Sequence, residues 1–297
     1  MIMKLYKTTI TPISNFATTL KGDTLFGQMC WSIRYALGEE KLTILLKDYE
    51  TEPFMVVSDG FASGYLPKPK IPSLLLGENS DEKKQNRKKI WLTIEQLQNG
   101  EFTEAKTDDE AQNSDKTALV IRNSINYKTF TTSDDGTFAP YSEKELSMSK
   151  KDIYFLIDET KFSLEELRES FEQLSLHGYG KDTTIGKGRF SFKEFEEVQQ
   201  GNESKTFMTL SPFSPQGLDC KELYYEPFTR FGKLGGDRSF VNAFKKPILL
   251  ADSGSVVHFD SKQKRQYIGK AIKGVSIAHP DSVHQGYSIV LPIKELA

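Results

Sequence analysis

A cluster of four glycines limits what this chain can fold into more than any other feature of the sequence. The glycines fall within eleven residues in the spacing G-x-G-x-x-x-x-x-G-x-G, at Gly178, Gly180, Gly186 and Gly188. Glycine tolerates a positive φ angle and the close approach of another backbone. Before the cluster, Ser163 and Glu166 form a capping box at the start of apolar residues with helical spacing over 163–175. A strand-like run over 189–195 follows it, so the sequence predicts a long loop between a helix and a strand.

Residues 177–189 do not match the common nucleotide-binding loops. No Lys-Ser or Lys-Thr pair follows the last glycine, as a Walker loop requires, and a dinucleotide fingerprint would follow a strand rather than a helix. The loop carries Lys181, Lys187 and Arg189 against Asp182. Together with a run of free backbone N–H groups, these cations would suit an extended phosphate backbone. The alternative interpretation is a long glycine-rich turn with solubilising lysines.

The order of the expected elements predicts an α+β fold with two ferredoxin-like (RRM-like, βαββαβ) domains. The first domain, 1–200, has strand, helix, hairpin, strand, helix and strand at 4–10, 25–37, 56–65, 152–157, 163–175 and 189–195. A second hairpin, at about 119–141 with a polar tip at 133–136, is inserted into it. Residues 201–297 are strand-rich with weak helical periodicity, which favours a second, degenerate domain of the same class. An acidic stretch, 101–115, is expected to be an exposed insertion or a mobile loop.

Composition excludes several classes of protein. No apolar run is long enough for a bilayer crossing, and the first residues lack the apolar region of a secretory signal, so the chain is expected to be cytoplasmic. Cys30 and Cys220 cannot build a disulfide framework. The 41 acids and 39 bases give a net charge of −2, but a phosphate backbone responds to local charge. Lys245 and Lys246, beside a Gly-Gly-Asp turn, are therefore further candidates for RNA contacts.

Candidate catalytic and metal-binding residues are few. His279, Asp281 and His284 lie close together, but the lack of supporting ligands elsewhere favours a surface turn over a metal site. Arg238 follows the Gly-Gly-Asp turn where a two-metal site needs a second acid. His177 is a candidate general base for RNA cleavage, and the alternative is that it caps its helix. We expect no catalytic residue, metal or cofactor.

Several motifs resemble one family. The spacing of the glycine-rich loop resembles that of the RAMP proteins of type III CRISPR–Cas surveillance complexes. Other segments are similar to the fourth subunit of the Csm complex in type III-A systems, in family order along nearly the whole chain. They are Gly-Asp-Thr-Leu-Phe-Gly-Gln-Met-Cys-Trp at 22–31, Gly-Tyr-Leu-Pro-Lys-Pro at 64–69, Asn-Ser-Ile-Asn at 123–126, Phe-Ala-Pro at 138–140, Gly-Ser-Val at 254–256 and Gly-Tyr-Ser-Ile at 286–289.

The resemblance implies a non-catalytic RNA-binding subunit. Such a subunit grips the repeat-derived 5′ tag of the CRISPR RNA (crRNA), and it docks against the large polymerase-like subunit and an adjacent RAMP subunit of the backbone. The inserted hairpin corresponds to the family's thumb, which displaces a base where the tag ends, and its expected RNA contacts are Asn123, Ile125, Asn126 and Tyr127. Tyr127 departs from the family pattern, which has an arginine there.

The start of the first helix, at Asp23 and Thr24, is a further candidate phosphate site, although Asp23 is expected to cap its own helix. In the thumb, Ile125, Tyr127 and Phe130 would either wedge a base out of its stack or pack between the hairpin strands. Two other functions stay open at this point: a RAMP endoribonuclease that processes precursor crRNA, and an interaction scaffold that does not contact RNA.

Overall fold

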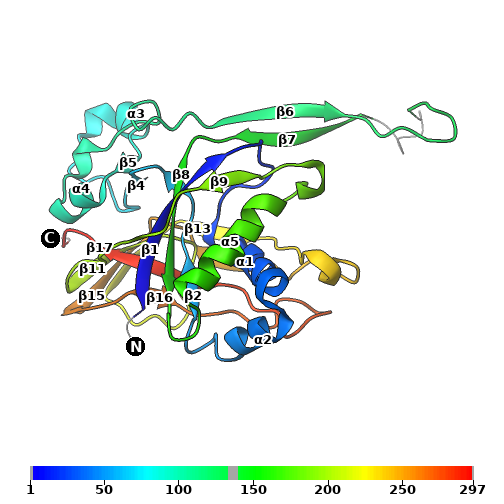
Figure 1. Cartoon of the computed structure of the whole chain (residues 1–297). Helices are drawn as coiled ribbons and strands as arrows, with labels where there is room; N and C mark the ends of the chain where they lie inside the picture. Colours follow the sequence, from blue (N-terminus) through cyan, green and yellow to red (C-terminus); the bar gives the residue numbers. More distant parts are fainter. Residues whose placement is uncertain (1–2, 133–139, 296–297) are drawn as a thin grey trace.

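The computed structural model describes residues 3–132 and 140–295. They form a first antiparallel sheet covered by helices, a second antiparallel sheet in the carboxy-terminal third, and a long hairpin that projects from the body (Figure 1). Antiparallel sheets and few helices make this a mixed α+β fold, which confirms that part of the sequence prediction. Among the described residues, no helix is both long and apolar enough to cross a membrane.

Two long strands form the centre of the first sheet. β1 (Lys4–Pro12) and β8 (Lys151–Ile157) pair antiparallel over seven residues, and every residue of β8 is buried. The sheet order is β10–β1–β8–β2, with β9 also paired to β1 and β3 to β8. The remaining strands are β2 (Met55–Val57), β3 (Phe61–Ala62), β9 (Phe190–Phe192) and β10 (Glu196–Glu197).

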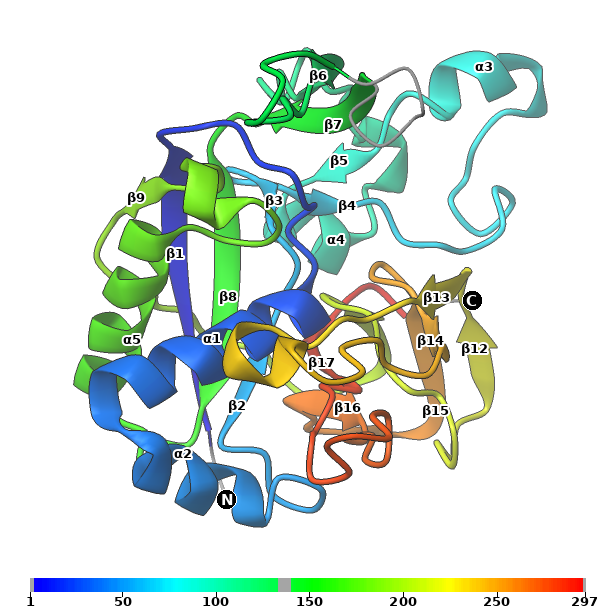
Figure 2. The ribbon, with the colours of Figure 1, turned by 90° about the vertical axis from the view of Figure 1, so that its right-hand side faces the viewer.

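Two helices pack side by side against this sheet. α1 (Gly22–Leu37) and α5 (Leu164–His177) contact each other, and their apolar stripes join the core above β1 and β8 (Figure 2). The predicted capping box of α5 is confirmed: Ser163 accepts the N–H of Glu166, whose carboxylate accepts the N–H of Ser163. α2 (Glu39–Lys47) follows α1 after Gly38, which has a φ of +94°.

The second sheet contains five strands in the order β12–β15–β11–β17–β16. A separate pair, β13 and β14, lies beside it. Among residues 201–295 there is a 3-10 helix, η4 (Gly236–Ser239), but no α-helix, so the two helices of a second βαββαβ unit do not appear there. The strands are β11 (Ser204–Thr209), β12 (Glu222–Tyr224), β13 (Pro227–Arg230), β14 (Ile248–Ala251), β15 (Val256–Gln263), β16 (Tyr267–Gly269) and β17 (Tyr287–Pro292).

One hydrophobic core joins the two sheets. Along β11, Met208 belongs to the core of the first sheet, while Phe207 points into a smaller cluster on the other side. At the junction, the side-chain amide of Gln285 accepts the N–H of Val57 at 2.9 Å and donates to its carbonyl at 2.8 Å, so it completes the edge of β2. The side-chain packing is therefore continuous across residue 200.

The predicted hairpin at 56–65 is wrong. β2 and β3 do not pair with each other; both pair with β8, Met55 opposite Ile157 and Phe61 opposite Asp152, as two pieces of one interrupted edge strand. Ser58 and Asp59, which lie between them, are buried, and the hydroxyl of Ser58 accepts the N–H of Tyr154. The segment at 58–60, which has the sequence of a turn, therefore connects two strands that pair with the same neighbour, β8.

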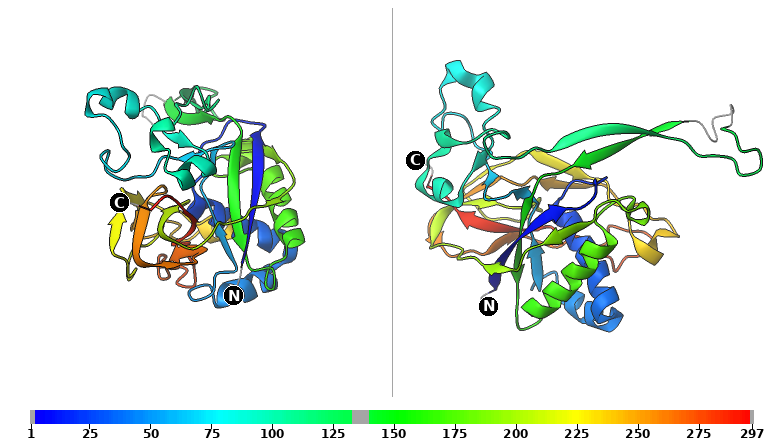
Figure 3. Two further views of the ribbon diagram at one scale, coloured as in Figure 1. Left: turned by 90° about the vertical axis from the view of Figure 1, so that its left-hand side faces the viewer. Right: turned by 45° about the horizontal axis from the view of Figure 1, so that its top comes forward.

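A small subdomain lies at the base of the projecting hairpin (Figure 3). Its elements are β4 (Leu66–Pro67), β5 (Trp91–Leu92), η1 (Ser80–Glu82), α3 (Lys83–Asn86), α4 (Ile94–Asn99) and η2 (Phe102–Glu104). The acidic stretch 101–115, expected to be an exposed insertion or a mobile loop, is a mostly exposed part of this inserted subdomain. Phe102 and Ala111 are buried, and Asp108 accepts a hydrogen bond from the indole N–H of Trp91 at 2.8 Å.

Candidate nucleic-acid interface

The projecting hairpin, which we call the thumb, consists of β6 (Lys116–Arg122) and β7 (Tyr141–Ser147) with the residues between them. The strands pair without interruption from Lys116 opposite Ser147 to Arg122 opposite Tyr141. The thumb is longer at its base than the predicted 119–141. The expected polar tip at 133–136 and residues 137–139 of the expected hairpin lie outside the described residues.

The distal part of the thumb presents large side chains to solvent. A small turn is closed by the N–H of Asn126, which donates to the carbonyl of Thr131 at 3.1 Å, and by Asn126 Oδ1, which accepts the N–H of Lys128 at 2.9 Å. Tyr127 is 88% exposed and Phe130 79% exposed, and Ile125 is exposed as well. These three side chains do not pack between the hairpin strands. Asn123 is also exposed.

The glycine-rich loop lies beside the thumb strands, with its lysines at Glu143 and Glu145 of β7, and closes on itself. All four glycines have positive φ angles, as expected. The N–H of Tyr179 donates to the carbonyl of Gly188 at 2.9 Å, and a Cβ on Gly188 would lie 2.1 Å from the carbonyl oxygen of Tyr179. A Cβ on Gly178 would similarly lie 2.4 Å from the carbonyl oxygen of Lys187. The close approach that these glycines permit is thus within the loop itself.

The expected run of free N–H groups is wrong for most of the loop. The N–H groups of Lys181, Gly188 and Arg189 donate to residues 14–18, at 3.0 Å to Thr18 Oγ1, 2.9 Å to the Asn15 carbonyl and 3.0 Å to Ser14 Oγ. Those of Gly178, Tyr179, Ile185, Gly186 and Lys187 bond within the loop or to α5. Little of this backbone is available to a phosphate.

Two of the predicted cations are neutralised by the thumb. Lys187 is 5% exposed, and its Nζ lies 3.1 Å from Glu145 and 3.6 Å from Glu143. Lys181 Nζ lies 2.9 Å from Glu143. Arg122 binds the same two carboxylates, at 2.8 Å to Glu143 and 2.7 Å to Glu145. With Asp182, this cluster contains three cations and three carboxylates; we call it the thumb root (Arg122, Glu143, Glu145, Lys181, Asp182 and Lys187).

Two carboxylates of the thumb root, Glu143 and Glu145, are held in their ionised form by lowered pKa values. Hydrogen bonds from the Asn15 amide and Lys187 lower the pKa of Glu145 to about 2. The hydrogen bond from Lys181 lowers the pKa of Glu143, and in return Glu143 raises the pKa of Lys181. Sequence analysis missed both glutamates. Their spacing of two on β7 was a usable signal, because it places both on one face of the strand.

The charges that remain available lie elsewhere. Arg189 is exposed and has no ion-pair partner among residues 3–132 and 140–295. On the opposite face of the thumb, Lys144 sits opposite Leu119, and both are exposed. The placement of Lys187 therefore does not support the expected phosphate contact, whereas the contact expected of Arg189 stays a prediction. Exposed aromatic side chains next to unpaired cations can stack bases and contact a phosphate backbone.

The start of α1 is not a phosphate site. The N–H of Gly22 donates to the buried carboxylate of Asp59 at 2.7 Å. Asp23 is also buried: it binds Arg230 through two hydrogen bonds of 2.6 and 2.7 Å and lies 3.4 Å from His284 Nε2. Asp23 therefore fixes the second half of the chain against α1. The expectation that it caps its own helix is wrong, because the N-cap of α1 is Lys21 and no side chain caps it.

The remaining candidates lie apart from the thumb root. Lys246 is exposed on the rim of a cleft beside β14, while burial lowers the pKa of the half-buried Lys245. His177 Nδ1 lies 2.8 Å from the carbonyl oxygen of Gln173, as expected for a residue at the end of its helix. Asp281 pairs with Arg238 at 3.1 Å. In the described part of the chain, no group of three His, Cys, Asp or Glu residues is placed to hold a metal ion.

These features define a class: an antiparallel α+β protein with a glycine-rich loop between its second packed helix and the last strands of the first sheet, and with a projecting hairpin. Residues 18–191, more than half of the chain, match the RAMP superfamily. The chain therefore belongs to the RAMP superfamily. No curated protein sequence matches it.

Solved structures share this fold over almost the whole chain. A chain of the Csm1–Csm4 cassette with AMPPNP matches at 18% identity with a TM-score of 0.58, covering 98% of both chains. A chain of the same cassette with pppApA matches at 17% identity with a TM-score of 0.61 and the same coverage. A chain of the Csm3–Csm4 subcomplex of the type III-A CRISPR–Cas interference complex matches at 15% identity with a TM-score of 0.60, covering 98% of this chain and 100% of that one. Csm4 is the subunit common to these complexes.

Proposed function

We propose that this chain is the Csm4-like subunit of a type III-A CRISPR interference complex in the cytoplasm. In this role it grips the 5′ repeat-derived tag of crRNA, docks the large Csm1-type subunit and an adjacent Csm3-type RAMP subunit, and catalyses no reaction. Membership of the RAMP superfamily and the likeness to chains of the Csm1–Csm4 and Csm3–Csm4 complexes support the proposal. The thumb, with its exposed distal side chains, is the observation that carries it.

The thumb has the chemistry that single-stranded RNA requires. Proteins recognise single-stranded RNA by stacking unpaired bases on aromatic side chains and by placing cations along the backbone. Ile125, Tyr127 and Phe130 offer exposed apolar and aromatic surface at the distal turn. Asn123 and Asn126 lie beside them, and Arg189 supplies a cation near the thumb root. In this proposal the thumb wedges a base out of the stack where the tag ends.

The domain division belongs to the same proposal. Residues 1–200 are the RAMP domain with the thumb, and the sheet order β10–β1–β8–β2 supports a ferredoxin-like arrangement there. Residues 201–297 are a second, degenerate domain that has the strands but not the α-helices of a βαββαβ unit in its described part. In this arrangement the thumb and the glycine-rich loop of the first domain carry most of the RNA contacts, and Lys245 and Lys246 of the second domain are the others that the sequence predicts.

The direct test combines RNA retention and RNA cleavage in one assay. The purified chain, with and without a Csm1-type subunit, is incubated with labelled crRNA that carries its repeat-derived tag or a scrambled tag. We expect retention that depends on the tag and leaves the RNA intact. Replacing Tyr127 and Phe130 by Ala should weaken retention tenfold or more, since a stacked base contributes about 1–3 kcal/mol. The matched control replaces Phe231 and Phe240, two exposed aromatics outside the thumb.

Two outcomes would replace the proposal. Specific cutting at the repeat, lost in His177→Ala, would indicate the endoribonuclease, although in the described residues His177 contacts its own helix and no carboxylate is paired with it. If the chain retains no RNA even with the Csm1-type subunit, an interaction scaffold that does not contact RNA would be the remaining function. The balanced charge of the thumb root is the observation that favours a scaffold, because it removes two lysines from any RNA contact.

A further inference from the structure

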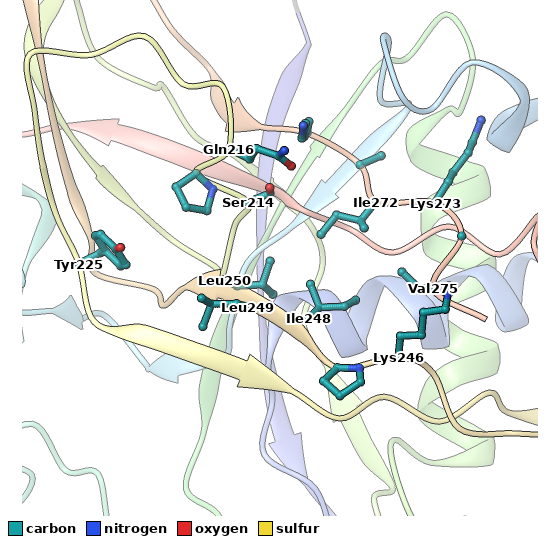
Figure 4. A pocket seen from close by; sticks show the side chains of 15 residues that line it. Ser214, Gln216, Tyr225, Lys246, Ile248, Leu249, Leu250, Ile272, Lys273 and Val275 are labelled. Atoms are coloured by element: carbon teal, nitrogen blue, oxygen red, sulfur yellow. The ribbon is translucent and has the colours of Figure 1, made fainter. Parts of the chain in front are cut away.

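The carboxy-terminal half of the chain contains a cleft that the thumb and the glycine-rich loop do not line, and Lys246, a candidate RNA contact from the sequence, lies at its rim. It lies between β14 and residues 270–275 and has a volume of about 690 Å³ (Figure 4). Its inner wall is apolar: Ile248, Leu250 and Val275 form a small buried cluster, against which Ile272 packs. A concave apolar wall that remains open to solvent is typical of a binding site.

The charge of the cleft has a single sign. Lys246, Lys270 and Lys273 are among its lining residues, and no Asp or Glu is. Lys273 Nζ is 2.6 Å from Glu50. Lys246 and Lys270 have no ion-pair partner in the described chain, so the cleft presents two uncompensated positive charges at its rim.

One edge of β14 is unpaired inside the cleft. Ala251 and Phe213 exchange both backbone hydrogen bonds at 2.9 Å, so the N–H and C=O of Ala251 point away from β13. These directions alternate along a strand, and therefore those of Leu249 also point away from β13. They have no hydrogen-bond partner among residues 3–132 and 140–295. At the other end, the N–H of Lys246 donates to the carbonyl of Val275 at 2.7 Å, which leaves a gap in the pairing between these two points.

These three properties together select an extended peptide rather than RNA. A peptide strand can pair with an open strand edge through its main chain, and it fills apolar pockets with alternate side chains. Lysines at the rim attract carboxylates on the other side chains. RNA would need stacking surfaces, and Tyr225 is the one aromatic residue among those lining the cleft.

We propose that this cleft binds an extended acidic segment of a partner protein, which adds as a short strand along β14. The edge from Lys246 to Ala251 spans roughly 16 Å at about 3.3 Å per residue, enough for a segment of about five residues. Such a segment alternates apolar side chains, which face Ile248 and Ile272, with Asp or Glu side chains, which reach Lys246 and Lys270. The partner is a subunit of the assembled complex, and in that respect alone the inference rests on the proposed function.

The first test uses the complex of the full-length chain with its Csm1-type and Csm3-type subunits. A carbodiimide joins a lysine amine directly to a carboxyl group, and mass spectrometry identifies the joined peptides. We expect Lys246 and Lys270 to be joined to Asp or Glu residues of one short partner segment. Lys246→Glu with Lys270→Glu should remove these links and weaken assembly at least tenfold. The control, Lys193→Glu with Lys264→Glu, makes the same charge change at two exposed lysines outside the cleft.

A second variant tests the strand pairing without changing charge. Leu249→Pro removes the N–H that points into the cleft, and proline is tolerated where an edge-strand N–H has no partner. We expect a several-fold loss of partner affinity with an unchanged melting temperature. If assembly proceeds at wild-type affinity in both Leu249→Pro and the double Lys→Glu variant, the proposal is overturned.

A synthetic probe separates this inference from the proposed function. The free chain is titrated with a fluorescein-labelled ten-residue peptide of alternating Glu and Val, with a peptide of alternating Lys and Val, and with ten-nucleotide oligouridine. If no complex assembles but the Glu–Val peptide binds and Lys246→Glu with Lys270→Glu abolishes binding, the proposed function fails and the inference stands. If the complex assembles without cross-links at these lysines, the inference fails alone. Oligouridine binding that depends on these lysines would make the cleft an RNA site and would also overturn it.

Discussion

The ion pair between Asp23 and Arg230 links the two halves of the chain, and its contribution to the free energy of unfolding can be measured. Asp23 lies in the first turn of α1 with its side chain fully buried, and Arg230 ends β13. The guanidinium binds both carboxylate oxygens, at 2.6 and 2.7 Å. Asp23→Ala would leave this cation next to α1 without its partner.

The loss of unfolding free energy in Asp23→Ala can be estimated from how deeply the two side chains are buried. Removing one partner of a buried ion pair costs about 3–5 kcal/mol. Because the Arg230 side chain keeps 20% of its exposure, part of its charge can be solvated, and we expect the lower end, about 3 kcal/mol. For a chain of this length about 2 °C of melting temperature corresponds to 1 kcal/mol, so Asp23→Ala should lower the melting temperature by about 6 °C.

The chain provides a matched control. Asp237 pairs with Arg34 at 3.0 Å, but its side chain is 57% exposed. Exposed pairs contribute about 0.2–1 kcal/mol, so Asp237→Ala should shift the melting temperature by about 2 °C or less. Differential scanning calorimetry at pH 7 compares the two variants, and adding Arg230→Met to Asp23→Ala should restore part of the loss. Equal shifts for the two Asp→Ala variants would refute the reasoning that burial sets the cost.

Three further results are expected. Burial raises the pKa of Asp23, but hydrogen bonds from His284 and Arg230 outweigh burial and hold it well below its usual range. Its contribution is therefore complete above the unfolded pKa of about 3.9 and is lost as the pH falls below it, so urea unfolding at pH 3 should show a smaller gap between wild type and Asp23→Ala than at pH 6. Gly188→Ala should cost several times more stability than Gly186→Ala in urea unfolding; both positions have a positive φ, but a Cβ at 186 meets no atom within 4 Å. Tyr127→Ala should leave the melting temperature within about 1 °C of wild type, since changes at exposed positions are usually within about 0.5 kcal/mol; a larger drop would mean that Tyr127 supports the fold of the thumb.

Local signals in the sequence predicted local structure well. The capping box at Ser163 and Glu166, the apolar stripe that follows it and the positive φ angles of the glycines all depend on residues close in sequence. Each of them appears in the structure where the sequence places it. The projecting hairpin was also predictable, because its strands are neighbours along the chain.

Long-range partners account for the errors. Lys187 was expected to be a free cation, but its carboxylate partners lie on β7, more than 40 residues away, and the pairing register brings them to it. The Asp-Gly of the expected 56–65 hairpin is a common turn signal, yet Asp59 is buried because it binds Lys21 at 2.9 Å and the N–H of Gly22. Local sequence patterns contain no information on partners that are distant along the chain.

The ionic character of the thumb root has a mechanical consequence. A two-stranded hairpin is marginally stable alone, so the direction in which the thumb points is fixed mainly where it is clamped. The thumb root includes Arg122, the last residue of β6, and Glu143 and Glu145 of β7, so the ion pairs hold the paired strands themselves and the turn at 123–132 extends beyond them. The thumb is thus a projecting hairpin whose orientation depends on ion pairs with the glycine-rich loop. Dissolved salt screens the exposed ion pair of Lys181 with Glu143 more than the buried ion pair of Lys187 with Glu145. We therefore expect the range of positions of the distal turn to widen as the ionic strength rises.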